Sequence, residues 1–570
     1  MVPGATDSAT INGFIVLLDV DAEVKQLNIL GTTVAINGSK NILVNDDFLW
    51  ADGGDIGNAS GGTITVSGKA KFTGGGSKDL SGKEILLNGG GTWLDGRMDL
   101  TNNSKLELAA DHTLHFMSDN LISVRTFHNS RFINNGTIKR SSASNKFLDF
   151  ASGFENHDSV IIESGVIRFF GAISDPGVIV INAPGLLFLS SCDFTHTEFI
   201  GGRIIVQGGF NEINVGTTID SRLDIVSGTL KNNIDLILNQ PFLLYSSGGF
   251  GSYVGGDGSH LTLNAKSHFS GFSFIKGAGS IEANDTFSFF GNDKRMEGDV
   301  SLTLNDVSIW SEGNIILEKN TQIVNEGVLH IETTVNKLVD RAGPFGSHAI
   351  INNGTIIKSD LSETEIEVHF QNNGMVLGIG TFNFANTTVS GSGTFGPGFS
   401  PGIITVDGDL NLDAGFLIEI EDETGEGIGH DLVKVAGQID ISDAFCQLTG
   451  AMNITDGTYK ILECTNGPGC YTGTFDTTYL PSDLRLDFRA DRINVVKGPA
   501  CINTWKVDGL FLSNDPHISL FQTANKIISN GMITSMEDIT FDAPQGAELI
   551  EGFEITANAN FAVTLVGCEE

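Results

Sequence analysis

Short apolar runs alternate with turn residues along most of the chain. From residue 10 to about residue 410 the chain contains strand-like runs of four to seven residues; examples are Thr63–Val66, Glu84–Leu87, Arg203–Val206 and Leu223–Val226. Turns made of Gly, Asn, Asp and Ser separate these runs. Such runs between turn residues are typical of β-strands, and almost no stretch repeats its apolar positions at the helical period of 3.6 residues. The pattern therefore predicts an all-β fold.

A longer repeat lies over the short one. The motif Trp-x-x-Gly occurs at 93–96 and again at 310–313, and Ile-Asn-Asn-Gly-Thr-Ile occurs at 133–138 and at 351–356. A third pair, 154–160 and 370–376, has nearly the same offset, about 217 residues. Three landmarks with one spacing predict an internal duplication, with copies at about 41–172 and 258–390.

Within each copy, a unit of the form apolar-x-Asn-x-Gly-apolar returns every 20 to 27 residues. This length suits one coil of a parallel β-helix, in which Asn side chains stack into ladders and Gly occupies left-handed turns. We expect a long, right-handed parallel β-helix at 41–390, preceded by N-terminal strands at 1–40. The expected ladder residues are Asn134, Asn156, Asn325, Asn352 and Asn372. The expected turn and repeat residues are Trp50, Gly53, Trp93, Gly96, Trp310, Gly313, Gly136, Gly354 and Gly374.

The sequence pattern changes near residue 391. A Gly-rich stretch at 391–402 is followed by longer apolar runs that alternate more regularly. We expect a β capping segment at 391–497, because an open solenoid end exposes strand edges that promote aggregation. Residues 498–570 contain short strand-like runs about ten residues apart, which predict a small stacked-strand module.

Composition restricts the partners more than the fold. The 570 residues include 71 Gly, and 69 Asp and Glu face 33 Lys and Arg, for a formal net charge of −36. Binding to nucleic-acid phosphates needs clustered basic residues, so these scattered ones argue against a nucleic-acid partner. No run approaches about 18 uninterrupted apolar residues, so no membrane span is expected. No ordinary secretion signal opens the sequence, and we take Met1 as the start of a shortened chain.

The cysteines indicate an oxidising compartment. There are six, at Cys192, Cys446, Cys464, Cys470, Cys501 and Cys568. Cys464 and Cys470 flank the turn sequence Thr-Asn-Gly-Pro-Gly, and Cys501 and Cys568 bracket the terminal module, so we predict that each pair forms a disulfide. The other two are expected to be buried thiols. A zinc site is the alternative, but no C-x-x-C motif or suitably spaced His pair is present. Disulfides favour an extracellular location.

Residues 41–497 resemble bacterial surface proteins with autotransporter-passenger-like β-strand repeats. In those proteins, phrases of the type Phe-x-Trp-x-Gly-Gly-x-Ile, loosely matched at 48–56, alternate with Phe-x-Asn-x-Gly-Thr-Ile, matched at 132–138. Residues 399–437 are similar to the end of that repeat region. Residues 518–568 look like the small stacked-strand module near the C-termini of many secreted Bacteroidota proteins. The resemblance implies a secreted or surface-displayed β-solenoid.

Carboxylates are the strongest candidates for chemistry, and no catalytic residue is assigned. A calcium site at Glu421, Asp422 and Glu423 is the alternative to a solvated acidic surface. Parallel β-helices also carry polysaccharide lyases and glycosidases, in which two acids flank the sugar bond. Trp50 and Trp93 are candidates for stacking on sugars, although a Trp-x-x-Gly motif in register with the repeat favours a structural role.

The sequence therefore predicts a non-catalytic extracellular β-solenoid with a structural or adhesive role. Its expected partners are glycans, cell-surface ligands or copies of itself, and no cofactor other than calcium is expected. Two alternatives stay open: a self-assembling extracellular filament subunit and a carbohydrate-active β-helix enzyme.

Overall fold

The computed structural model describes residues 4–497 apart from 58–60, 172, 175–176, 247–249, 333–335, 341–346, 399–400, 412–414, 451–453, 456 and 482–483. Beyond residue 497 it describes only the backbone of strands between 502 and 564. The chain divides into two compact units, the first comprising 1–329 and 336–350 and the second 330–335 and 351–570. The described residues form strands, turns and bends without a helix, and none of them could span a membrane as a helix.

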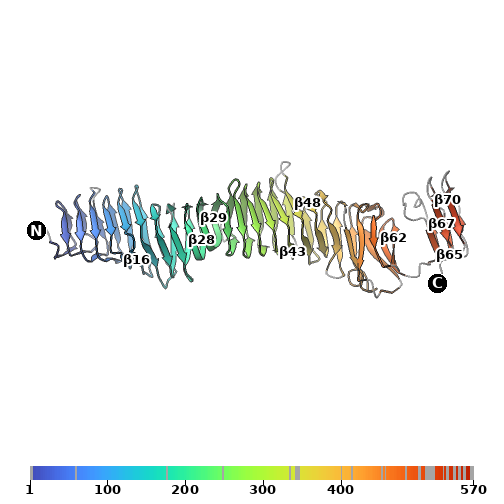
Figure 1. Ribbon diagram of the computed structural model, residues 1–570, viewed down its shortest axis with the longest axis horizontal. Helices are drawn as coiled ribbons and strands as arrows, with labels where there is room; N and C mark the ends of the chain where they lie inside the picture. The colour runs from blue at the N-terminus through green and yellow to red at the C-terminus, as the bar shows by residue number, and fades with distance from the viewer. Residues whose placement is uncertain are drawn as a thin grey trace. The chain divides into compact units, whose positions relative to one another are not determined.

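The first unit is a parallel β-solenoid, drawn as a stack of coils in Figure 1. Most strands pair in parallel with the strand three positions further along the chain, so that a coil holds three strands. Thus β4 (Gln26–Leu30) pairs with β7 (Phe48–Ala51), β7 with β10 (Ala70–Thr73), and β10 with β13 (Gly91–Trp93). The exceptions are the long strands β28 (Glu198–Ile213) and β29 (Thr218–Asn232), which pair with each other and with several shorter strands. The chain returns to the same face after each coil, and paired strands lie about 4.8 Å apart. The predicted all-β parallel solenoid is confirmed.

Alternate side chains point into the coil and stack on their equivalents in the next coil. One interior column runs in register through Val44, Val66, Leu87, Leu108, Asn134 and Asn156. Another runs through Trp50, Phe72, Trp93 and Phe116, with ring centroids 4.6 Å apart for Phe72 and Trp93 and 5.1 Å apart for Trp93 and Phe116. Burying one such side chain contributes roughly 1.5–3 kcal/mol, so these columns supply much of the stability.

The second unit is built in the same way and then changes strand direction. β46 (Thr355–Lys358) pairs in parallel with β49 (Met375–Gly378), and β49 with β52 (Thr394–Pro397). Parallel pairing continues from β53 (Ile403–Asp407) through β56 (Leu432–Val435) to β59 (Gly457–Cys464). β59 and β62 (Leu484–Arg489) both pair antiparallel with β63 (Arg492–Lys497). β63 therefore covers a strand edge that β59 would otherwise expose.

Beyond residue 497, short strands pair in parallel. β64 (Ile502–Val507) pairs with β65 (Leu520–Ser529), β65 with β67 (Asp538–Asp542), and β67 with β70 (Asn560–Thr564). Cys501 and Cys568, which the sequence predicts as a disulfide, lie outside the described residues.

Candidate functional site

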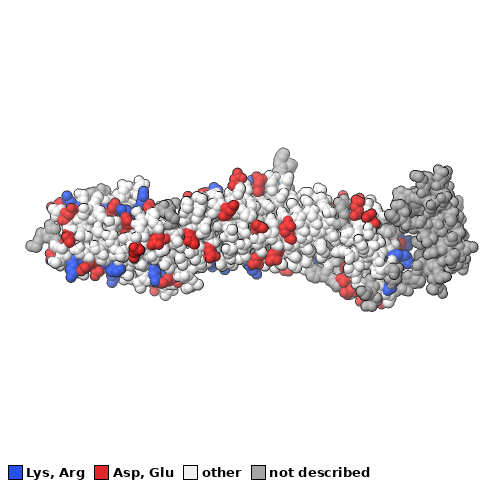
Figure 2. All heavy atoms as spheres, viewed as in Figure 1, with Lys and Arg blue, Asp and Glu red and all other residues white. Residues whose placement is uncertain are grey.

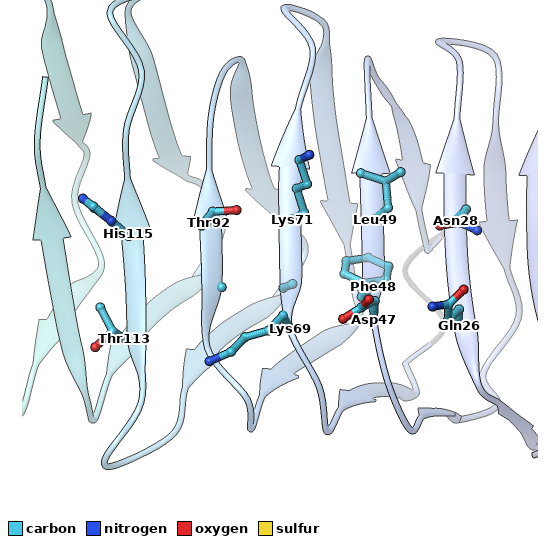
Figure 3. Close-up of a pocket in the computed structure, with 12 residues that line it drawn as sticks. Gln26, Asn28, Asp47, Phe48, Leu49, Lys69, Lys71, Thr92, Thr113 and His115 are labelled. Atoms are coloured by element: carbon cyan, nitrogen blue, oxygen red, sulfur yellow. The ribbon is translucent and has the colours of Figure 1, made fainter.

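A groove lined by both apolar and polar residues lies on an outer face of the first unit, across β4, β7, β10, β13 and β16 (Thr113–Phe116) (Figure 3). Its volume is about 540 Å³. Strand alternation sends every second residue outward, and the register aligns one outward residue from each coil along the groove. That row is Asn28, Leu49, Lys71, Thr92 and His115. The groove therefore presents a series of different side chains at the spacing of the coils.

Three consecutive glycines, at 89–91, help to form the hollow. They leave this coil without a side chain between Lys69 of the preceding coil and Thr113 of the following one, while Thr92 lies between Lys71 and His115. A Cβ atom on Gly89 or Gly91 would collide with the backbone of the preceding coil, so glycine permits this close approach. The ammonium of Lys69 donates a hydrogen bond to the carbonyl oxygen of Gly89 at 2.7 Å.

The groove combines basic, acidic and neutral groups. Lys69, Lys71 and Asp47 are exposed. Within the described part of the chain, the Lys71 side chain has no hydrogen bond or ion pair. His115 Nε2 lies 2.5 Å from Ser141 Oγ, and burial, with the positive charge of Lys139, lowers the pKa of His115. His115 is consequently neutral at pH 7, which leaves two positive charges and one negative charge along the groove.

Two hydrogen bonds join residues of the predicted asparagine ladder. Asn134 Nδ2 donates to Asn156 Oδ1 at 2.6 Å, and Asn352 Nδ2 donates to Asn372 Oδ1 at 2.7 Å. The first pair occupies the interior column that carries aliphatic side chains in preceding coils. Asn325 is also buried, and its Nδ2 donates to the carbonyl oxygen of Gly327 at 3.4 Å. These amides lie inside the coil, so they do not contribute to the outer surface.

The three described tryptophans anchor turns. The indole nitrogens of Trp50 and Trp310 donate to the carbonyl oxygens of Gly53 and Gly313, each at 2.8 Å, and that of Trp93 donates to Asp95 at 3.1 Å. All three rings are buried. They therefore cannot stack on a sugar, and the sugar-stacking alternative for Trp50 and Trp93 does not hold.

The predicted turn glycines lie where neighbouring coils approach closely. Gly96 and Gly313 adopt positive φ angles of 89° and 67°, in the left-handed region that favours glycine. A Cβ atom on Gly136 would collide with backbone oxygens of the preceding coil, and one on Gly374 would collide with the carbonyl oxygen of Gly354. Small residues at these turns allow the coils to stack.

Buried cations are the feature that sequence reasoning missed. Five side chains of the described residues share this property: Lys78, Lys83, Lys294, Arg140 and Lys358. The ammonium groups of Lys78 and Lys294 donate to the carbonyl oxygens of Gly74 and Gly291, at 3.2 and 3.1 Å, and burial lowers the pKa of each lysine to about 8. The signal was available, because the offset of 216 to 218 residues aligns Lys78 with Lys294 and Arg140 with Lys358.

The carboxylates gather in two different arrangements. Asp55, Asp79 and Asp99 form an outward row in register, in which burial and a hydrogen bond with Asp55 raise the pKa of Asp79. Arg125 holds Asp99 through two hydrogen bonds of 2.7 Å. This row brings carboxyl groups of successive coils together.

In the acidic loop of the second unit, Asp422 Oδ1 accepts a hydrogen bond from the Thr424 backbone nitrogen at 2.8 Å, while Glu421 and Glu423 are exposed. Among the described residues, no three His, Cys, Asp or Glu side chains are placed to share a metal ion. Calcium at Glu421, Asp422 and Glu423 stays a prediction.

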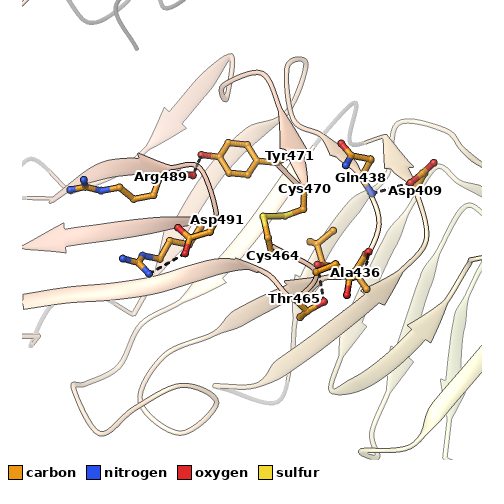
Figure 4. The surroundings of a disulfide bond; sticks show 12 residues. Asp409, Ala436, Gln438, Cys464, Thr465, Cys470, Tyr471, Arg489 and Asp491 are labelled. Atoms are coloured by element: carbon orange, nitrogen blue, oxygen red, sulfur yellow. Dashed lines mark hydrogen bonds and ion pairs between the residues drawn. A yellow bond between two sulfur atoms is a disulfide. The ribbon is translucent and has the colours of Figure 1, made fainter. Parts of the chain in front are cut away.

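One predicted disulfide is present. Cys464 and Cys470 are bonded, with their Cα atoms 5.4 Å apart, and the bond closes the turn that leads out of β59 (Figure 4). Next to it, Thr465 Oγ1 donates to the carbonyl oxygen of Val435 at 3.1 Å, and the Tyr471 hydroxyl donates to that of Arg489. Cys192 and Cys446 are free thiols and are buried. Burial raises the pKa of Cys192 to about 11 and that of Cys446 to about 12, so both stay protonated at neutral pH.

The strand pairing and coil register define the chain as a parallel β-solenoid. No protein-family model matches it, and no curated protein matches it. Among solved structures, the crystal structure of the Haemophilus influenzae Hap adhesin is similar over 82% of this chain and 64% of that chain, with 10% sequence identity and a TM-score of 0.27. This chain thus spans less than two thirds of the length of that chain. A similarity of this size supports no conclusion about ligand or activity.

Proposed function

We propose that the chain is a non-catalytic extracellular β-solenoid that acts by adhesion. The observation that carries the proposal is a row of exposed amides in the first unit. Asn264 Nδ2 donates to Asn239 Oδ1 at 2.9 Å, Asn284 to Asn264 at 2.9 Å, and Asn305 to Asn284 at 2.7 Å. The same type of side chain is thus fixed at the same position on four coils.

Such a surface suits a repetitive ligand. Each coil offers one weak contact, and because the coils are rigidly spaced, many weak contacts act together on one polymer. The buried lysine ammonium groups, tryptophan indoles and asparagine amides stabilise turns and ladders inside the coil. The rows of outward side chains are not needed for that purpose and are available to bind a ligand. The Cys464–Cys470 disulfide supports an oxidising, extracellular location.

Figure 2 shows acidic and basic side chains scattered over the visible face of the first unit, without one dominant basic patch. With a net charge of −36, this distribution favours glycans or other cell-surface ligands over nucleic acid.

A glycan array, run together with a reducing-sugar assay on the same preparation, tests the proposal. We expect retention on a subset of glycans without release of reducing ends. Failure to bind any glycan, cell surface or second copy of the chain would contradict adhesion. Fibres in negative-stain microscopy of the purified chain would instead support the filament alternative.

A second candidate function, glycoside cleavage, rests on Asp79 alone, because its raised pKa is the property that a general acid needs. Asp55 does not fit as the second catalytic carboxylate, because it hydrogen-bonds to Asp79, whereas the two carboxyl groups of glycosidases lie about 5 to 9.5 Å apart. Release of reducing ends by the wild-type chain, abolished by Asp79→Asn, would establish this function in place of adhesion.

A further inference from the structure

The two copies of the duplication differ at the groove. Aligning Trp93 with Trp310 places Lys71 opposite Ser288 and Thr92 opposite Ile309. The glycines at 89–91 correspond to Asp-Val-Ser at 306–308. Of the two interior neighbours of Lys71, Phe72 corresponds to Phe289, whereas Ala70 corresponds to Phe287, and all four are buried. The coil therefore does not require the residues that make the groove.

The groove has the chemistry of a site for an acidic sugar chain. Its lining offers amide, hydroxyl and ammonium groups, and Lys71 is exposed without an ion pair in the described structure. The two lysines outnumber Asp47, although the chain as a whole carries 36 excess negative charges. A local positive charge on an acidic protein attracts an anionic ligand and fixes its position.

The spacing of the groove favours a sugar chain of extended form. Outward residues in the row recur about every 4.8 Å, close to the length of one sugar ring in an extended glycan. In Figure 3, Asn28, Lys71, Thr92 and His115 project from neighbouring strands along one face. Successive sugars lying across successive coils would each meet a different hydrogen-bonding group.

We propose that this groove binds an extended, carboxylate-bearing glycan, with Lys71 facing a carboxylate and Thr92 bonding to a sugar hydroxyl in the hollow. The inference rests on the proposed adhesive function and identifies its site and ligand class. A single Lys71 contact supplies charge specificity, while Asn28, Thr92 and His115 supply the polar contacts that select a sugar.

The test variant is taken from the second copy of the duplication. The double substitution Lys71→Ser, Thr92→Ile gives the first copy the two residues that the second copy has at the equivalent positions, Ser288 and Ile309. Lys266→Ser is the matched control, because Lys266 is an exposed lysine of the same unit outside the groove. Circular dichroism and thermal melting of all three proteins check that the fold is kept.

Isothermal titration of the full chain with oligogalacturonate measures the binding. We expect the double variant to bind at least about tenfold more weakly than wild type, because a charge-assisted and a neutral hydrogen bond are lost. The Lys266→Ser variant should bind as the wild type does, and uncharged cello-oligosaccharides of equal length should bind much more weakly.

Three results would overturn the assignment: no binding of oligogalacturonate by the wild type, equal binding by the wild type and the double variant, or equally tight binding of polyglutamate, which would indicate an acidic peptide as ligand. If the glycan array shows acidic-glycan binding that the double variant retains, the groove assignment fails while adhesion stands. If the array and the cell-surface assays show no binding, the proposed function itself fails.

Discussion

The two copies of the internal duplication share several interior side chains and differ at the outer row that lines the groove. Trp93 and Trp310 both donate an indole hydrogen bond within a turn, and Lys78 and Lys294 both bury an ammonium group against a glycine carbonyl. On the outside, Lys71 and Thr92 of the first copy are replaced by Ser288 and Ile309. Stacking constrains the interior side chains, because each must fit its equivalents in two neighbouring coils, whereas an outer row is free to change with its ligand.

One buried pair shows how far the interior can vary. Arg140 and Lys358 occupy equivalent positions, and both are fully buried. The ammonium of Lys358 donates to Asp360 Oδ1 at 3.0 Å and to Ser362 Oγ at 3.1 Å. Arg140 Nη2 donates to the carbonyl oxygen of Lys146 at 3.2 Å, while its Nε and Nη1 have no partner in the described structure. The position keeps a cation, and the adjoining turn supplies different partners.

Trp93→Ala and Trp310→Ala should have the largest effects. We expect Trp93→Ala to lower the free energy of unfolding by about 5 kcal/mol and Trp310→Ala by about 3–4 kcal/mol, because Trp93 lies between the stacked rings of Phe72 and Phe116. Denaturant titrations followed by circular dichroism measure both. Equal losses would show that the aromatic stack in the first copy adds nothing beyond burial.

The buried lysines should make stability depend on pH. Lys78 and Lys294 lose their protons near pH 8 in the folded chain and near 10.5 when unfolded, so between these values the unfolded chain binds more protons. Stability contributed by each lysine therefore rises with pH across this window, by up to about 3 kcal/mol. Lys78→Met or Lys294→Met should reduce the rise in melting temperature between pH 8 and 10. Lys71→Met, which replaces an exposed lysine, is the control and should leave this rise unchanged. An unchanged pH profile in both buried variants would disprove the coupling.

The asparagine pairs should contribute equally in the two copies. Asn134→Ala and Asn352→Ala each remove an amide donor and leave the oxygen of Asn156 or Asn372 without it, at a cost of about 1–3 kcal/mol. Urea midpoints of the two variants, compared with Asn239→Ala on the surface row, measure this. If Asn239→Ala lowered the free energy of unfolding as much as the two buried variants do, the distinction between interior and surface asparagines would be contradicted.

Substitutions in the groove should have the smallest effect on stability. Lys71→Ser with Thr92→Ile should change the free energy of unfolding by no more than about 0.5 kcal/mol, since both side chains lie on the outer face. Thermal melting at pH 7 measures the change. A loss of several kcal/mol would show that the groove residues support the coil and are not free to serve a ligand.

The sequence predicted what depends on periodicity. Short strand-like runs and the recurring Asn and Gly units predicted a parallel solenoid, and the confirmed pairing of β4 with β7 and of β7 with β10 follows from that repeat. The turn between Cys464 and Cys470 was short enough to predict their disulfide.

The features that could not be predicted from the sequence depend on the register between neighbouring coils. Lys71, Thr92 and His115 are more than 20 residues apart and share a row only because the coils stack with one particular offset. The burial of Lys78 was also missed, because a lysine in a polar stretch is ordinarily solvated, and only the folded turn supplies the carbonyl oxygen of Gly74. The contact between Asp55 and Asp79 was not predicted either, because it too depends on the register between neighbouring coils.

The most direct test of the central claim is a time course on immobilised polygalacturonate that records retained protein and released reducing ends together. We expect the wild-type chain to stay bound without releasing reducing ends and the Lys71→Ser, Thr92→Ile variant to be washed off. Steady release of reducing ends by the wild type, lost in Asp79→Asn, would contradict the central claim.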